Sequence, residues 1–221
     1  QSIPTGNLAF RTNLMSAFFG VLAALIISDL ARRSYSSKRF PSLWIGIVTG
    51  LAFGLSPLFW SQAIITEVYT LNIFFIVLLL RLAPLNERPP EKWKPWLDIF
   101  GGVIFGLALG NQLTVIFIFP LWILVGSLDH DKVSEFKWNS FFKTQNPFLR
   151  LWQLLDWHSL LRQILFVLVG LTIYFSIPVR AQSGSPVVWG NPVDLKGLWW
   201  LISGQLYQDR VFSLELQYLV P

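Results

Sequence analysis

The sequence predicts an all-α, polytopic membrane protein with about six transmembrane helices. Only 13% of its 221 residues are charged and 53% are hydrophobic, whereas about 25% of the residues of a soluble domain are charged. The hydrophobic residues also form runs that are too long for the core helices of a soluble protein. Composition and run length together exclude an ordinary soluble globular protein.

Apolar runs and the residues that interrupt them define the expected helices. The first span contains the run LMSAFFGVLAALII. The second carries glycines at four-residue spacing from Gly46 to Gly54, a spacing that lets neighbouring helices approach closely. Pro57 should end or kink this second helix. The predicted spans are residues 13–30, 43–60, 69–83, 96–110, 113–128 and 164–177.

The fourth and fifth spans are predicted from a region of intermediate length. Residues 96–128 are too many for one span and few for two, and Asn111 and Gln112 lie at their midpoint. The loops on both sides of this region are basic, so they should lie on the same face of the membrane. That requires an even number of crossings, with a turn at Asn111 and Gln112.

Positive charge is concentrated in three alternate loops, which hold 13 of the 17 Lys and Arg residues. The positive-inside rule places these loops in the cytoplasm and both termini outside it. The net charge of +5 is thereby explained by membrane topology, and no nucleic-acid partner is expected. The basic residues of the three loops are Arg32, Arg33, Lys38 and Arg39; Arg81, Arg88, Lys92 and Lys94; and Lys132, Lys137, Lys143, Arg150 and Arg162.

Two regions follow from this topology. Residues 1–178 form the predicted transmembrane domain, and residues 179–221 form a less apolar, extracytoplasmic or interfacial segment. Trp199 and Trp200 suit a helix that lies at the level of the lipid headgroups. The chain begins with Gln1 and stops within an apolar stretch, so we expect it to be a fragment of a longer protein that continues at both ends.

Glu67 is the main candidate for chemistry on the outer face, because it is the only acid there outside the C-terminal segment. A carboxylate near the hydrocarbon boundary is costly unless it is paired or faces water. It could act as a general base or orient a hydroxyl acceptor. It could equally cap a helix or form a salt bridge at a helix start. The sequence leaves both interpretations open.

The other outer-face candidates also have two explanations each. Arg180 could hold a phosphate in bidentate fashion, or extend to lipid headgroups from a helix end. Asn111 and Gln112 could bind sugar hydroxyls, or satisfy backbone groups at helix ends. Trp189 and Tyr207 could stack on a sugar, or belong to the interfacial aromatic belt.

No metal site and no cofactor are expected. The chain has no cysteine, and His130 and His158 lie in a basic loop without a partner at ligand spacing. The sequence contains no glycine-rich phosphate-binding loop.

Four segments identify a family resemblance: FRTNLMSAFFGVLAA from Phe10, SPLFWSQAIITEVYTLN from Ser56, FGLALGNQLT from Phe105 and YFSIPVRAQSGSPVVWGNP from Tyr174. Their content, order and spacing resemble the DUF2723 family of protein O-mannosyltransferase-like membrane proteins, within the GT-C glycosyltransferase superfamily. The EVYTLN and PVRA…WGNP elements are the specific part of the resemblance.

The resemblance implies a GT-C-like hexosyltransferase. Such an enzyme would transfer a sugar, expected to be mannose, from a lipid-linked donor to a Ser or Thr hydroxyl of a protein acceptor. The donor would be a polyprenyl or dolichyl phosphate sugar, and transfer would take place outside the cytoplasm with inversion at the anomeric carbon. The matched motifs contribute Glu67 and Tyr69 from EVY, Arg180 from PVR, and Trp189 and Asn191 from WGNP.

The chain departs from the family pattern in two places. Relatives carry their leading candidate for the catalytic acid in a first outer loop, whereas residues 1–12 contain no acid; the main catalytic carboxylate is therefore expected upstream of Gln1. Gln112 occupies a position where relatives often carry histidine, which argues against a titrating group at that turn.

Two rival functions remain at this stage. A membrane transporter or lipid flippase would place polar residues near the membrane midplane, whereas here they gather at one rim. A non-catalytic scaffold is the other alternative. The absence of cysteine and of visible sequons favours a bacterial inner membrane over the endoplasmic reticulum.

Overall fold

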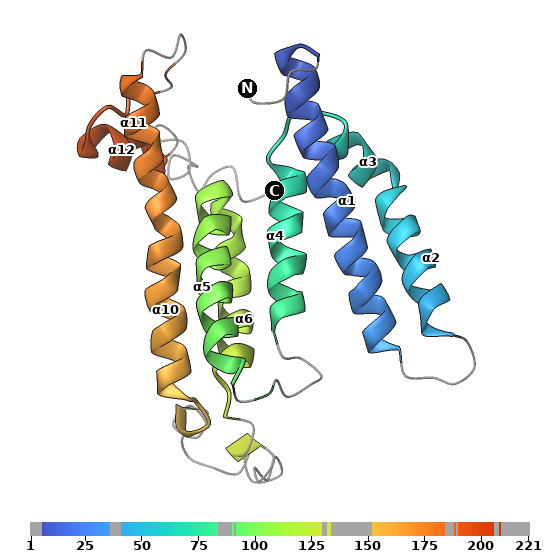
Figure 1. Cartoon of the computed structure of the whole chain (residues 1–221). Coiled ribbons are helices and arrows are strands. Elements are labelled where there is room, and N and C mark those ends of the chain that lie inside the picture. Colours follow the sequence, from blue (N-terminus) through green and yellow to red (C-terminus); the bar gives the residue numbers. More distant parts are fainter. Residues whose placement is uncertain are drawn as a thin grey trace, which may run out of the picture. The chain divides into compact units, whose positions relative to one another are not determined.

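All regular secondary structure in the described residues is helical (Figure 1). The computed structural model describes residues 6–35, 41–83, 90, 92–129, 132–133, 152–183, 188, 190–205 and 208. Across these ranges the only extended pairing is a single bridge between Leu128 and Leu155. The predicted all-α class is confirmed for this part of the chain.

The chain divides into two compact units, Gln1–Leu171 and Thr172–Pro221. The first unit contains α1 (Leu8–Ser34), α2 (Ser42–Gly54), α3 (Pro57–Ala63), α4 (Tyr69–Leu82), α5 (Lys94–Asn111), the 3-10 helix η1 (Leu113–Ile118), α6 (Phe119–Ser127) and α10 (Trp157–Leu171). The second unit contains the 3-10 helix η2 (Thr172–Phe175), α11 (Ser176–Gln182) and α12 (Leu195–Ile202).

Two helical stretches of the described chain are long and apolar enough to cross a membrane, Leu8–Ser34 and Trp157–Gln182. The pair α2 and α3 adds a third crossing if it counts as one span, although its two helices are bent by 67°. The bend falls at Pro57, where the sequence predicted a break. By length and composition this is a membrane protein, and the full set of six spans stays a prediction.

The turn expected in the middle of residues 96–128 is present. Helix α5 ends at Asn111, and Gln112 has extended backbone angles (φ −155°, ψ 124°) before η1 begins. The chain therefore reverses between α5 and the η1–α6 segment, as the pattern of basic loops required.

The last predicted span, residues 164–177, lies within a longer helical stretch, Trp157–Gln182. Helix α10 begins at Trp157 because Asp156 caps it: its Oδ1 accepts the backbone N–H groups of His158 (3.0 Å) and Ser159 (3.3 Å). Arg162, which the sequence assigned to a loop on its charge, consequently lies inside a helix.

Helices α5 and α10 pack through glycines. A Cβ atom on Gly102 would lie 2.7 Å from the carbonyl oxygen of Gln163, and Cβ atoms on Gly106 or Gly170 would collide with the backbone of the opposite helix. Small residues thus bring the two backbones together, as is common between membrane helices. The adjoining core contains Leu79, Ile104, Phe105, Ala108, Leu109, Val115, Trp122 and Val167.

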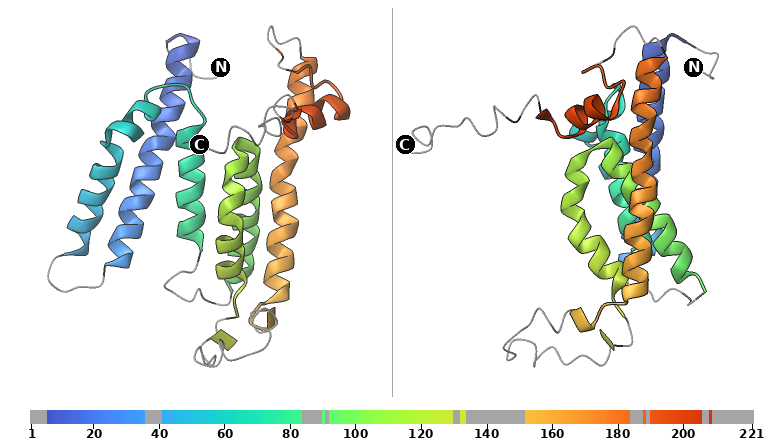
Figure 2. Two further views of the ribbon diagram at one scale, coloured as in Figure 1. Left: turned by 180° about the vertical axis from the view of Figure 1, so that it is seen from behind. Right: turned by 90° about the vertical axis from the view of Figure 1, so that its left-hand side faces the viewer.

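In the first unit α1, α4 and α6 run in one direction and α2, α5 and α10 in the other, which gives that unit two distinct ends (Figures 1 and 2). The Glu67 end comprises the start of α1, residues 64–68, the start of α4 and the end of α5. The Asp98 end comprises the end of α1, the end of α4 and the starts of α5 and α10. The basic side chains whose ion pairs define the Asp98 end are Arg32, Arg33, Arg81, Lys94 and Arg162.

Candidate functional site

The segment that carries Glu67, residues 64–68, joins α3 to α4 and is fastened to α1. The Thr66 hydroxyl lies 2.7 Å from Oγ1 of Thr12 and also contacts Oδ1 of Asn13. The Ser16 hydroxyl donates to the backbone carbonyl of Glu67 at 3.5 Å. These contacts join residues more than 50 positions apart in the sequence.

A second attachment comes from α5. The Asn111 side-chain amide donates to the carbonyl oxygen of Val68 at 3.3 Å. Asn111 therefore satisfies a backbone group, as its structural interpretation predicted, but the group belongs to the segment that carries Glu67. Side chains of two different helices therefore hold the backbone carbonyls of Glu67 and Val68.

The Glu67 carboxylate, in contrast, points to no partner. The residue is exposed, and within the described ranges its carboxylate has neither a hydrogen bond nor an ion pair. The residue before α4 is Val68, which provides no side-chain cap. Among the described residues, Glu67 therefore forms neither the helix cap nor the salt bridge that were its alternative structural roles.

Several polar groups at the Glu67 end are buried without a hydrogen-bond partner in the described part of the molecule. They include Oγ1 of Thr70, Oδ1 of Asn72 and Oε1 of Gln112. Thr70 and Asn72 lie in the first turn of α4, directly after Tyr69, which is 46% exposed. Sequence reasoning missed Thr70 and Asn72, although the polar positions of TEVYTLN were the available signal.

The second unit carries Arg180 in the last turn of α11. Its side chain is exposed and makes no hydrogen bond or ion pair to the residues that the structure describes. The guanidinium is therefore available to an anion in this unit, although a headgroup contact would need the same exposure.

Asn191 lies in a turn before α12, where its backbone has an unusual conformation. Asn191 and Gly190 have positive φ angles of 45° and 68°, which glycine and asparagine adopt most readily. Gln182 donates to the carbonyl of Val193 at 2.8 Å, and Asp194 caps α12 by accepting the N–H of Gly197 at 2.7 Å. Asn191 thus shapes a hydrogen-bonded turn.

The candidate residues fall into two groups. The structure brings Glu67, Tyr69, Asn111 and Gln112 to the Glu67 end of the first unit, whereas Arg180 and Asn191 lie in the second unit. Trp189 and Tyr207 lie outside the described residues.

A buried ion pair at the other end of the first unit escaped the sequence analysis. Asp98 is 4% exposed. Its Oδ2 accepts from Nη2 of Arg162 at 2.8 Å and from Nε at 3.2 Å, while its Oδ1 accepts from Ser159 at 2.8 Å and Gln163 at 3.0 Å. Both carboxylate oxygens are satisfied, so Asp98 joins α5 to α10.

A second ion pair lies beside this network. Nζ of Lys94 donates to Oδ2 of Asp156 at 2.7 Å. Burial raises the pKa of Asp156, but the hydrogen bond from Lys94 and those from the N–H groups at the start of α10 outweigh it, so the pKa lies below its usual range.

No group of three potential metal ligands among His, Cys, Asp and Glu occurs in the part of the chain that the structure describes. His158 is highly exposed, with a side-chain exposure of 92%. His130 lies outside the described residues.

Comparison with known proteins decides the family. Residues 1–135 match the family model described as the protein O-mannosyl-transferase TMEM260 N-terminal domain. The chain belongs to this family. The TMEM260 N-terminal domain family therefore covers the helices α1 to α6, including Glu67, Tyr69, Asn111 and Gln112.

A relative of known name extends the similarity beyond the TMEM260 N-terminal domain. The mouse (Mus musculus) protein O-mannosyl-transferase TMEM260 is 29% identical over 200 residues, which are 88% of this chain and 24% of the relative. The chain thus spans about a quarter of the length of that curated relative. No solved structure matches the chain.

These comparisons sharpen two earlier expectations. The name of the relative is that of a transferase, so the transporter or flippase alternative is not favoured. The relative is a mouse protein, which gives no support to a bacterial membrane and leaves the endoplasmic reticulum open.

Proposed function

We propose that the chain is part of a membrane glycosyltransferase of the GT-C type. It transfers a sugar, expected to be mannose, from a polyprenyl or dolichyl phosphate donor to a Ser or Thr hydroxyl of a protein. Membership of the TMEM260 N-terminal domain family supports transfer to protein. Glu67 is the observation that locates the site: within the described residues its carboxylate has no partner, while its backbone segment is held by α1 and α5.

The chemistry assigns one task to each charged group. The acceptor hydroxyl oxygen attacks the anomeric carbon as Glu67 orients the hydroxyl or accepts its proton. The bond between that carbon and the phosphate oxygen breaks, and its electron pair leaves with the lipid phosphate. Arg180 neutralises the charge that develops on this leaving group. Attack from the side opposite the phosphate inverts the anomeric carbon.

The fixed backbone around Glu67 favours this role. A carboxylate whose main chain is already held loses little conformational freedom when it orients a substrate. Tyr69, Asn111, Gln112, Trp189, Asn191 and Tyr207 are the proposed substrate contacts.

The proposed membrane topology keeps six spans, with the Glu67 end outside the cytoplasm. With the exception of Arg11 in the first turn of α1, the described basic side chains of the first unit gather at the Asp98 end, which supports a cytoplasmic location for that end. Residues 1–178 remain the proposed transmembrane domain and residues 179–221 the extracytoplasmic segment.

The test is sugar transfer by the full-length natural protein in liposomes with radiolabelled polyprenyl phosphate mannose and a Ser/Thr-rich protein acceptor. Label on the acceptor is expected, and Arg180→Ala should reduce the rate by about 10- to 100-fold. Lys196→Ala is the matched control, because Lys196 is also an exposed cation of the second unit. Movement of the donor between leaflets without transfer would overturn the proposal in favour of a flippase.

A further inference from the structure

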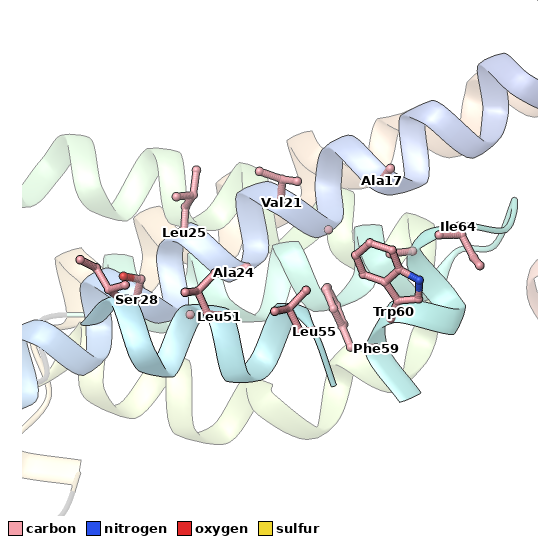
Figure 3. A pocket seen from close by; sticks show the side chains of 15 residues that line it. Ala17, Val21, Ala24, Leu25, Ser28, Leu51, Leu55, Phe59, Trp60 and Ile64 are labelled. Atoms are coloured by element: carbon pink, nitrogen blue, oxygen red, sulfur yellow. The ribbon is translucent and has the colours of Figure 1, made fainter. Parts of the chain in front are cut away.

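An apolar groove runs along α1, α2 and α3 on the first unit (Figure 3). It has a volume of about 520 Å³. Its walls include Ala17 and Ala24 of α1, Leu51 of α2, Leu55 directly after α2, and Trp60 of α3. Apart from the Trp60 indole nitrogen, Ser28 supplies the only polar side-chain atom of the lining. A groove of this composition on membrane helices suits a hydrocarbon chain.

The groove exists because small residues and a bend leave space. A Cβ atom on Gly54 would have one neighbour within 4 Å, the Cβ atom of Ala24 at 3.5 Å. The 67° bend between α2 and α3 turns Phe59 and Trp60 across the far end.

The other end of the groove is positively charged. Ser28 lies one helical turn before Arg32, whose Nη2 donates to Oδ1 of Asp29 at 2.7 Å. Asp29 Oδ2 also accepts from Arg33 at 2.8 Å and Arg81 at 2.7 Å. Among the residues that the structure describes, one carboxylate at this end thus faces three guanidinium groups.

Arg32 retains the capacity to bind an anion. Its side chain is 46% exposed and that of Arg81 is 37% exposed. A guanidinium carries five N–H donors. In the described contacts, Arg32 and Arg81 each donate through one nitrogen to the Asp29 carboxylate.

We propose that this groove binds an anionic phospholipid. One acyl chain lies along the groove that α1, α2 and α3 line, and the anionic headgroup binds Arg32, where Arg81 adds to the positive potential. The part of α1 that lines the groove, from Ala17 to Ser28, is about 16 Å long at 1.5 Å per residue. This is about half of the 30 Å hydrocarbon core, so the groove matches the acyl chain of one leaflet.

The polarity of the groove excludes the sugar donor as its occupant. The proposed reaction needs the donor phosphate at the Glu67 end, whereas the arginines lie at the opposite end of α1. The phospholipid belongs to the leaflet at the Asp98 end. The exclusion of the donor rests on the proposed function, whereas the phospholipid site itself rests on the apolar lining of the groove and on Arg32 at its end.

Photolabelling tests it on the full-length natural protein in vesicles. The probes are phosphatidylserine and phosphatidylcholine with a photoreactive group in the acyl chain, and mass spectrometry locates the label. Phosphatidylserine should label groove residues such as Leu51 and Trp60 about fivefold more than phosphatidylcholine, given one arginine contact. Arg32→Gln should bring the two lipids to the same level. Equal labelling of the parent protein by both lipids would overturn the proposal.

A filling variant makes the test specific. Gly54→Leu should abolish groove labelling, because a Cβ atom there has only Ala24 within 4 Å and the rest of the new side chain would occupy the groove. Val48→Phe is the matched control, since Val48 lies on the same helix, is 62% exposed and does not line the groove. The proposal is wrong if the groove residues of the Gly54→Leu variant are labelled as strongly as those of the parent protein. It is also wrong if the groove takes no lipid label because another helix of the full-length protein fills it, or if only a photoreactive polyprenyl phosphate sugar labels it.

Discussion

Asp98 and Glu67 are both carboxylates of the first unit, but their surroundings are opposite. Asp98 is 4% exposed, and four hydrogen bonds from three α10 side chains satisfy its two oxygens. Glu67 is exposed, and its carboxylate has no partner within the described residues, although its backbone is fixed. A paired acid holds helices together, whereas an unpaired acid on a rigid segment is free to act on a substrate.

The largest expected effect breaks the Asp98 side of this comparison. Asp98→Leu leaves the Arg162 charge without its buried partner and should lower the free energy of unfolding by about 3–5 kcal/mol. Denaturant titration of the detergent-solubilised protein measures this. The double variant with Arg162→Leu should recover most of the loss, because no unpaired charge remains. If the double variant were no more stable than the single one, the ion pair would not be the reason.

A smaller loss of stability is expected at the α5–α10 contact. In Gly106→Leu the new side chain collides with the backbone of α10 around Val167, so the free energy of unfolding should fall by about 1–3 kcal/mol. Gly54→Ala provides the control, since its Cβ meets only Ala24 at an ordinary distance. Equal stability of the two variants would contradict the close packing of α5 on α10.

The attachment of the Glu67 segment should have a moderate effect on activity. Asn111→Ala removes the hydrogen bond to Val68 and should reduce the transfer rate about tenfold, while stability changes by about 1 kcal/mol. Measurement of both quantities on one preparation separates positioning from folding. A transfer rate equal to that of the parent protein would show that this bond does not position Glu67.

The smallest effect concerns pH. The pKa of Asp156 lies below its usual range in the folded protein. Its charge therefore stabilises the fold fully at pH values above the ordinary Asp pKa of about 4. This stabilisation is lost as the pH falls through the lowered pKa. The parent protein should therefore exceed Asp156→Asn in stability by about 0.5–1 kcal/mol at neutral pH, and this gap should close in strong acid. A gap independent of pH would contradict the ion pair with Lys94.

Local chain chemistry made much of this fold predictable. Pro57 marked the break between α2 and α3, and the polar pair Asn111 and Gln112 marked the end of α5. Long apolar runs gave the helical membrane class without any tertiary information. Each of these features depends on residues that are close together in the sequence.

The parts that escaped prediction depend on distant residues. Asp98 and Arg162 are separated by 64 positions, so neither the pairing nor the helical position of Arg162 could be inferred from local charge. Glu67 was found because it is an isolated acid in an apolar region. The attachments of its segment, residues 66–68, to Thr12, Ser16 and Asn111 required the structure.

The most direct test of the contrast between the two acids compares Glu67→Gln with Asp98→Asn in full-length protein, with sugar transfer and unfolding measured on the same samples. Glu67→Gln should reduce transfer by about 10²- to 10⁴-fold and leave the free energy of unfolding within about 0.5 kcal/mol, and Glu67→Asp should restore part of the activity. Asp98→Asn should lower stability while the folded fraction still transfers sugar. Unchanged transfer in Glu67→Gln, or a loss of its stability as large as that of Asp98→Asn, would contradict a functional role for this carboxylate.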